Sequence, residues 1–411
     1  MADVEGEVHR IRTRLTRGPR AALRADELLE VALRRSHRGD FTDRSFVRPF
    51  ELLLEAAHAE ADLSALGRRA LRFDALRFLR NQLTFDALEA ASPAVLARPI
   101  RAPIFIAGMP RSGTTFLHRL ILKDPQTMAP RLWQLVHPRP ARSGALASAV
   151  RKGWVGLQLA VFRALAPELS ALHPVALDAP EECTEITAHV FQSLRFESTY
   201  RVPSYGRWLE RRGLLAAYRF HRRFLQHLDA ERPGRRWVLK SPDHVFALED
   251  LRAVYPDAHL VFIHRDPVRV LASVARLTEV LRRPFTRHID RAEIGRHVST
   301  AWLQGAHCMS ELAARGEPVL HLTYRQVIAD PLEAVRRIYD HCGLALGAEA
   351  QAAMRSWLRS AVNLDRPRPS YELADYGLDA GLQRERFAHY TNRFGIEPER
   401  NGTRTSKGAL A

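Results

Sequence analysis

Cysteine is scarce in this 411-residue chain. Its three cysteines, Cys183, Cys308 and Cys342, are odd in number and widely spaced. This pattern excludes a disulfide framework and a paired-cysteine zinc site, and it favours a reducing, cytoplasmic location. The chain also lacks an H-E-x-x-H motif, so no metal is expected.

Long hydrophobic runs are absent as well. The most apolar helix-like stretch, 153–162, is bounded by Lys152 and Arg163 and is shorter than the roughly 20 residues that a bilayer requires. The first residues carry no apolar run behind a basic segment, so no signal peptide is expected. We therefore predict no transmembrane segment.

Negative charge is in deficit. The chain has 62 Lys and Arg against 46 Asp and Glu, a net charge of +16, and only four of the basic residues are lysine. Such an excess is typical of proteins that bind nucleic acid or anionic membranes. The arginines are dispersed, however, and no helix-turn-helix or RNP-like strand accompanies them. We expect solvated arginine-rich faces and no nucleic-acid partner.

Short apolar runs alternate with helical patterns in the middle of the chain. Four runs read as buried strands and lie at 102–107, 236–239, 259–263 and 318–322, while helical patterns occupy 115–123, 246–254, 268–282 and 332–341. This alternation predicts an α/β fold, with a P-loop-like parallel sheet flanked by helices. Ligands of such sheets bind beyond the carboxyl ends of the strands, where this sequence places basic residues.

The remaining segments suggest three parts. Residues 1–98 read as a helical N-terminal region packed on the core, and residues 99–400 as the α/β domain with a mainly helical insertion at about 125–235. Residues 401–411 are small and polar and are expected to form a flexible tail.

A glycine-bearing loop follows the first strand. Residues 108–115, Gly-Met-Pro-Arg-Ser-Gly-Thr-Thr, have the spacing of a P-loop, but Thr114 stands where that motif has its lysine. A basic residue, Arg111, lies inside the loop instead. The loop therefore suits an anionic group bound without Mg²⁺. A P-loop kinase acting on a nucleotide or small molecule is the alternative interpretation.

The segment 110–115 resembles the 5′-phosphosulfate loop of sulfotransferases that use 3′-phosphoadenosine 5′-phosphosulfate (PAPS), in the bacterial branch with the P-R-S-G-T-T sequence. Two further segments support the resemblance, which covers residues 100–345. Arg265 and Ser273 have the spacing of the 3′-phosphate site, and 323–331 is similar to the family's Y-E-x-L-x-x-D-P segment, with Arg325 in place of Glu. The C-terminal R-K-G-x-x-G segment of cytosolic members has no good match. Residues 370–395 resemble the tail of the bacterial branch.

The resemblance implies a sulfotransferase fold, with PAPS as donor, 3′-phosphoadenosine 5′-phosphate (PAP) as product and no metal. It assigns Arg265 and Ser273 to the 3′-phosphate and Tyr324 to the surroundings of the adenine. It assigns Phe116 to the adenine. It assigns five loop residues to the 5′-phosphosulfate: Arg111, Ser112, Gly113, Thr114 and Thr115.

Catalysis would move a sulfuryl group to a hydroxyl, or less readily an amine, of a small-molecule or lipid-like acceptor. Arg111 and Lys240 are the cations suited to stabilise the leaving group. The general base is His244, four residues after Lys240, or a carboxylate of the acidic run 178–182, with Glu182 ahead of Glu181. Cytosolic members have their histidine two residues after the lysine, so the offset here differs.

The acceptor is poorly encoded. The insertion between Leu132 and Trp208 is rich in apolar residues, which either line a pocket for a lipid-like acceptor or simply pack the helical layer. A basic rim would equally admit an anionic sugar. A homodimer is compatible with the sequence. The apolar residues concerned are Trp133, Trp154, Leu157, Leu159, Val161, Phe162, Leu165, Leu169 and Leu172.

Overall fold

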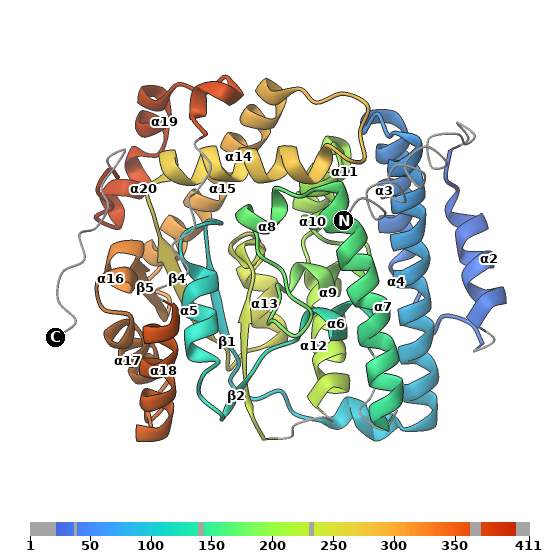
Figure 1. Ribbon diagram of the computed structural model, residues 1–411, viewed down its shortest axis with the longest axis horizontal. Coiled ribbons are helices and arrows are strands. Elements are labelled where there is room, and N and C mark those ends of the chain that lie inside the picture. Colours follow the sequence, from blue (N-terminus) through green and yellow to red (C-terminus); the bar gives the residue numbers. More distant parts are fainter. Residues whose placement is uncertain (1–21, 37–38, 139–143, 230–233, 362–370, 400–411) are drawn as a thin grey trace, which may run out of the picture.

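A five-stranded parallel sheet forms the centre of the protein in a computed structural model that describes residues 22–36, 39–138, 144–229, 234–361 and 371–399 (Figure 1). The strand order is β2-β3-β1-β4-β5. The strands are β1 (Ile104–Gly108), β2 (Thr127–Met128), β3 (Arg236–Lys240), β4 (His259–His264) and β5 (Val319–Thr323).

The four predicted strands are confirmed within two residues at each end. The fifth, β2, lies inside the segment expected to be mainly helical, where it pairs with the start of β3. Two residues are too few to show an alternating pattern, so this edge strand leaves no periodic signal in the sequence.

Strand β1 lies at the middle of the sheet, and all five of its residues are buried. Its side chains alternate between two hydrophobic clusters because successive residues of a strand point to opposite faces. Phe105 joins the larger cluster, whereas Ile104 and Ile106 join the smaller one. The continuous apolar run seen in the sequence is thus explained by helices on both faces.

The smaller cluster is covered by helices that follow β1 and β5. The larger cluster unites the other face with the N-terminal helices and most of the insertion, which lie on the opposite side in Figure 1. The first set comprises α5 (Thr114–Ile121), α16 (Tyr324–Ala329), α17 (Pro331–His341) and α18 (Ala348–Ala361).

The N-terminal helices share the larger cluster with the sheet. They are α2 (Ala25–Ser36), α3 (Val47–Glu60), α4 (Ala65–Ala91) and the 3-10 helix η1 (Pro93–Ala97). The division at residue 98 stays a prediction, and the predicted tail lies outside the described residues.

The insertion supplies seven helices to the described part of the chain, among them a 22-residue helix, α7, at the surface. They are α6 (Leu132–Val136), α7 (Gly144–Leu165), α8 (Leu169–Leu172), α9 (Thr184–Ala188), α10 (Arg195–Thr199), α11 (Pro203–Arg212) and α12 (Leu215–Asp229). No helix in the described segments is both long and apolar enough to cross a membrane.

The remaining helices follow β3 and β4 or close the C-terminal part. They are η3 (Pro242–Phe246), α13 (Leu248–Val254), α14 (Pro267–Arg282), α15 (Arg291–Ala314), η5 (Leu373–Tyr376), α19 (Ala380–Arg386) and α20 (Ala388–Arg393).

Candidate active site

The loop between β1 and α5 has the backbone of a tight anion-binding turn. Gly108 has φ 134°, and a Cβ there would lie 2.3 Å from the carbonyl oxygen of Ile263 on β4, so only glycine fits. Arg111 and Gly113 also have positive φ, 64° and 95°. The N-terminus of α5 follows at once, where backbone N–H groups lack partners inside the helix and favour negative charge.

Arg265 and Ser273 lie against this loop. Asp266 caps α14 by accepting from Val268 N, and Pro267 occupies the first turn. The start of α14 is thereby fixed directly after β4, with Ser273 fewer than two turns along. Arg265 Nη1 donates to the carbonyl oxygen of Arg111 over 2.6 Å, and Arg111 Nε donates to Ser273 Oγ over 3.2 Å. The two anion motifs therefore form one continuous cluster.

Two C-terminal residues contact the same cluster, and the sequence interpretation missed their roles. Nε and Nη2 of Arg265 each lie 2.7 Å from a carboxylate oxygen of Glu399, whose backbone N–H donates to Asp266. The hydroxyls of Tyr371 and Ser273 are 2.9 Å apart. The contact with Glu399 shows that the Arg265 guanidinium is placed to donate two hydrogen bonds to the oxygens of one oxyanion.

Lys240 lies on the other side of the loop. It ends β3, its side chain is 3% exposed, and Nζ lies 3.2 Å from Thr115 Oγ1 and forms an ion pair with Glu182. Cys183 N donates to the carbonyl oxygen of Lys240 over 3.1 Å. This backbone contact explains why Glu182, distant in sequence, meets the lysine.

The acidic run divides among three partners. Asp178 pairs with Lys152 at the surface, Glu182 with Lys240, and Glu181 with His173. Burial opposes ionisation of both Glu181 and His173, but their mutual hydrogen bond and charges lower the pKa of Glu181 to about 2 and raise the pKa of His173 above its ordinary value. His173 is thus a basic group near the loop, with its charged form favoured by Glu181, that the sequence interpretation missed.

His244 occupies a different environment. Its Nδ1 is 2.6 Å from the Tyr218 hydroxyl, its ring packs edge-on against Phe105, and its buried Nε2 has no partner among the described residues. Burial, followed by the charges of His221 and Lys240, lowers the pKa of His244 well below its ordinary value. These contacts place the ring in the larger hydrophobic cluster, whereas Glu182 touches Lys240 beside the loop.

Aromatic residues border the loop on both sides. The Tyr324 ring lies under the Arg265 guanidinium, 3.9 Å from it, and would be 3.0 Å from a Cβ at Gly113. Phe116 packs against Trp357 of α18, with ring centroids 5.6 Å apart. Trp357 is a further aromatic that no motif indicated.

Ser112 indicates that the loop suits an oxyanion ligand. Its Oγ is buried and has no hydrogen-bond partner within the described residues. A buried hydroxyl without a partner is costly unless a ligand or water supplies one. The residues present therefore fit a phosphosulfate at this position.

A metal would have to compete with protein cations. Ligand atoms of His173, Glu181 and Glu182 lie within 4.8 Å of one another. In the structure, these groups are already paired with each other and with Lys240. The expectation that no metal is needed stays a prediction.

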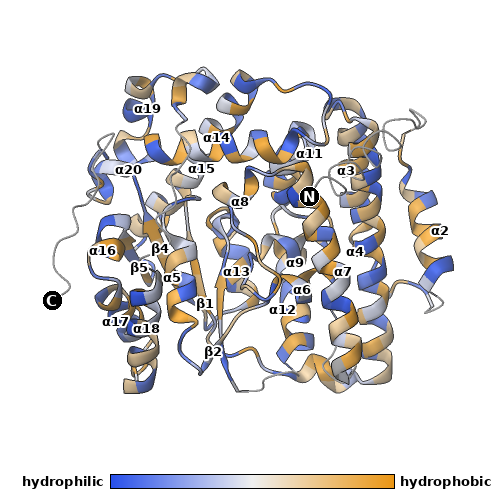
Figure 2. Cartoon of the chain, in the orientation of Figure 1, coloured by the Kyte–Doolittle hydropathy of each residue, from blue (hydrophilic) through white to orange (hydrophobic). Residues whose placement is uncertain are grey.

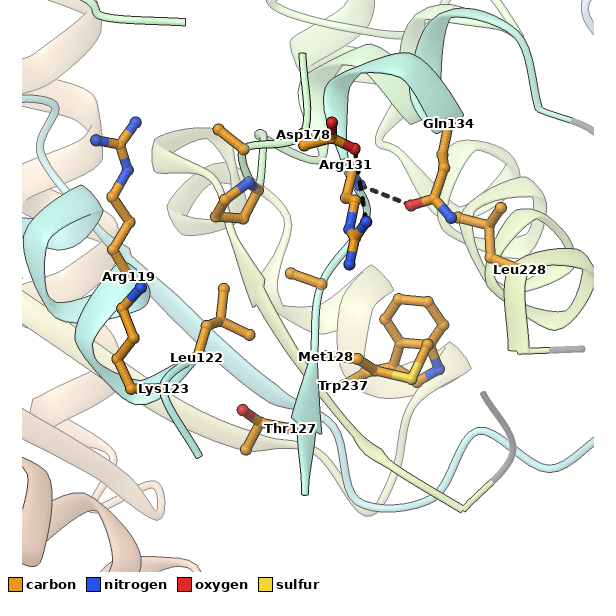
Figure 3. A pocket seen from close by; sticks show the side chains of 13 residues that line it. Arg119, Leu122, Lys123, Thr127, Met128, Arg131, Gln134, Asp178, Leu228 and Trp237 are labelled. Carbon is orange, nitrogen blue, oxygen red and sulfur yellow. Dashed lines mark hydrogen bonds and ion pairs between the residues drawn. The ribbon is translucent and has the colours of Figure 1, made fainter. Parts of the chain in front are cut away.

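A separate groove runs along the sheet edge between α5, β2 and residues 178–180 (Figure 3). Its volume is about 480 Å³, within the range of small-molecule sites. Arg119, Lys123 and Arg131 contribute basic groups, and Met128 and Trp237 contribute apolar surface. Pro180 on its wall precedes Glu182 by two residues, but none of the loop residues 108–115 lines the groove.

Comparison with known proteins decides the family. The model of the sulfotransferase family matches residues 103–347, more than half of the chain. The chain belongs to the sulfotransferase family. The expected membership of the PAPS-dependent sulfotransferase family is thereby confirmed, and the kinase alternative is not favoured.

Solved sulfotransferases share the fold of this one. STF1 from Mycobacterium tuberculosis is 31% identical, with 90% of this chain and 100% of that chain covered and a TM-score of 0.79. STF9 from Mycobacterium avium is 28% identical, covering 91% and 97%, with a TM-score of 0.80. The predicted α/β sulfotransferase fold is therefore confirmed.

Curated relatives carry the name omega-hydroxy-beta-dihydromenaquinone-9 sulfotransferase Stf3. Those of Mycobacterium bovis and Mycobacterium tuberculosis are each 27% identical to this chain over 263 residues. The match covers 61% of this chain and 64% of each relative.

Proposed function

We propose that the protein transfers the sulfuryl group of PAPS to a hydroxyl of a lipid-like acceptor, such as a hydroxylated isoprenoid quinone. One observation carries the proposal: the loop 108–115 contacts Arg265 and Ser273 on one side and the Lys240–Glu182 pair on the other. The acceptor class is suggested by the name of the Stf3 relatives.

The donor would be held at both of its anionic ends. Arg111, Ser112 and the N-terminus of α5 would bind the 5′-phosphosulfate, with Gly113, Thr114 and Thr115 shaping the turn. Arg265 and Ser273 would bind the 3′-phosphate, and Tyr324 with Phe116 would border the adenine. When bound, PAPS supplies an activated sulfuryl group and leaves as PAP.

Glu182 is the proton acceptor that the geometry favours. Its contact with Lys240 brings a carboxylate and a cation to the same end of the loop, where the acceptor hydroxyl must lose a proton. Lys240, Arg111 and the protonated His173 would offset negative charge that develops at the bridging oxygen. His244 stays the alternative base, because its buried Nε2 has no partner among the described residues.

The cysteines support a cytoplasmic setting for the reaction. Cys183, Cys308 and Cys342 are free, and burial raises the pKa of each. Unpaired thiols of this kind suit the reducing cytoplasm, where we place the reaction.

The test compares two acceptors that differ in one hydroxyl. Purified protein is incubated with PAPS and a polyprenyl quinone bearing a terminal hydroxyl, or the same quinone without it, and PAP and sulfated lipid are quantified. We expect PAP and sulfated lipid in equal amounts, and only with the hydroxylated lipid. Transfer of a phosphoryl group from ATP, without release of PAP from PAPS, would contradict the proposal.

A further inference from the structure

The surface helix α7 exposes an almost uncharged face. Five of the nine large hydrophobic side chains exposed in the described part of the chain belong to it, from Leu146 (80% exposed) through Trp154 (60%) to Val161 (44%). The other exposed residues between 146 and 164 are Ala or Gly, except Arg163. The large members of this apolar face are Leu146, Val150, Trp154, Leu157 and Val161.

Helical spacing explains why these residues share one face. Their separations are three or four residues, the period at which side chains line up along a helix. Figure 2 shows α7 on the near side of the molecule with hydrophobic residues along it, and no labelled element is drawn in front of it. Trp154, Leu157 and Val161 therefore do not pack inside the helical layer, which was one of the two roles expected for them, and they do not line the groove described above.

A contiguous exposed apolar face is typical of a surface that binds another protein or a membrane. The charge of α7 helps to distinguish between these two kinds of partner. The helix contains no acidic residue. Lys152 is paired with Asp178, whereas Arg163 is exposed and donates to the neutral carbonyl oxygen of Val175. The chain as a whole has a net charge of +16. An apolar face on a helix without acidic residues, in a chain of this charge, complements the interface of an anionic bilayer, where Trp is favoured at the level of the headgroups.

The position of α7 connects this face to the active site. The helix ends seven residues before Leu172, whose carbonyl oxygen accepts from Arg111 Nη1 over 2.6 Å. Leu169 and Leu172 of α8 pack with Val280 of α14, the helix that carries Ser273. The apolar face therefore lies on the helix that leads directly into the segment contacting the loop.

We propose that the apolar face of α7 docks on the surface of an anionic lipid bilayer and so brings the active site to a membrane-held acceptor. The inference rests on the proposed function, because a lipid-like acceptor with a long hydrocarbon tail would reside in such a bilayer. The helix would lie in the interface rather than span it.

Vesicle binding tests the inference. Wild-type protein, the double variant Trp154→Glu/Leu157→Glu and the control Leu382→Glu are sedimented with vesicles of phosphatidylcholine alone or mixed with phosphatidylglycerol. Leu382 is an equally exposed leucine, 53%, on α19. We expect wild type and control to bind the mixed vesicles, and the double variant to bind at least roughly 10-fold more weakly, since it loses two buried apolar side chains.

Two results would overturn the inference. One is unchanged vesicle binding by the double variant. The other is a wild-type dimer that the double variant converts to a monomer without any change in vesicle binding, which would assign the face to a second copy of this chain. Titration of all three proteins with PAP separates the causes: binding of PAP without binding of vesicles refutes the docking alone, whereas failure to bind PAP refutes the proposed function. Equal PAP binding also shows that the variants are folded.

Discussion

Replacement of Arg265 by alanine should weaken binding of PAP and leave binding of AMP nearly unchanged, because AMP has the 5′-phosphate and lacks the 3′-phosphate. The side chain is 14% exposed and its fork already holds a carboxylate with two contacts of 2.7 Å. A hydrogen bond to a charged group contributes about 1.5–3 kcal/mol. One such contribution corresponds to a roughly 10- to 150-fold increase in the Kd of PAP.

We expect an increase in the lower part of that range, because the Arg265 guanidinium is already paired with Glu399 before PAP binds. The 3′-phosphate of PAP must displace the Glu399 carboxylate from Arg265. The net free energy of binding gained at Arg265 is therefore smaller than the energy of the new ion pair alone. Glu399→Gln should accordingly have the opposite effect and tighten PAP, since the neutral amide competes less well for Arg265. AMP should be insensitive to this second variant too.

Isothermal titration of wild type and both variants with PAP and with AMP measures these effects. Arg265 also donates to the carbonyl oxygen of Arg111, so its loss could distort the loop that binds the 5′-phosphate. AMP binding controls for this distortion, because AMP contacts the loop and lacks the 3′-phosphate. An equal loss of affinity for PAP and AMP in Arg265→Ala would show that the mutation only distorts the loop. Unchanged PAP affinity would refute the assignment of the 3′-phosphate.

The remaining predictions concern turnover and acid stability. Glu182→Gln should lower kcat by about 100-fold or more with PAP affinity retained, the size expected for loss of a general base; near-normal turnover, with His244→Ala inactive, would move the base to His244. Lys240→Met should lower kcat by roughly 100- to 1,000-fold, as for loss of one donor to developing charge, and steady-state kinetics with saturating PAPS would show it. Burial raises the pKa of Glu279, but hydrogen bonds from Tyr376 and three arginines outweigh it and lower the pKa to about 2. Its stabilisation, on the order of 3 kcal/mol, is therefore present above the unfolded pKa of 4.5 and lost as pH falls toward 2. Urea unfolding should show Glu279→Gln less stable than wild type at about pH 7, with the difference reduced to roughly half or less near pH 3 and nearly absent near pH 2; a gap that does not shrink on acidification would contradict this.

The strands that carry the site were predictable because each is a short apolar run buried on both faces. Helix starts were predictable where the cap is local, as at Asp266 and Pro267 before α14. Strand β2 was not, because two residues that pair with β3 carry no periodicity. The same limit applies to the surface of α7, since periodicity shows an apolar helical face and not whether the protein covers it.

Within the site, predictability follows distance along the chain. Arg111 to Thr115 form one local turn, so their grouping is visible in the sequence. The contacts of Arg265 with Glu399 and of Glu181 with His173 depend on how the C-terminal segment and the insertion fold over the sheet. In the sequence Glu182 is one of three acids, and its position beside Lys240 depends on the backbone contact between Cys183 and Lys240.

Titration of the unmodified protein with PAP in EDTA, beside ATP and AMP, tests the central claim most directly. The account predicts tight binding that requires the 3′-phosphate and persists without metal, even though His173, Glu181 and Glu182 could ligate one. Binding of ATP that requires Mg²⁺, together with no binding of PAP, would contradict the account and favour the interpretation of the loop as the P-loop of a kinase.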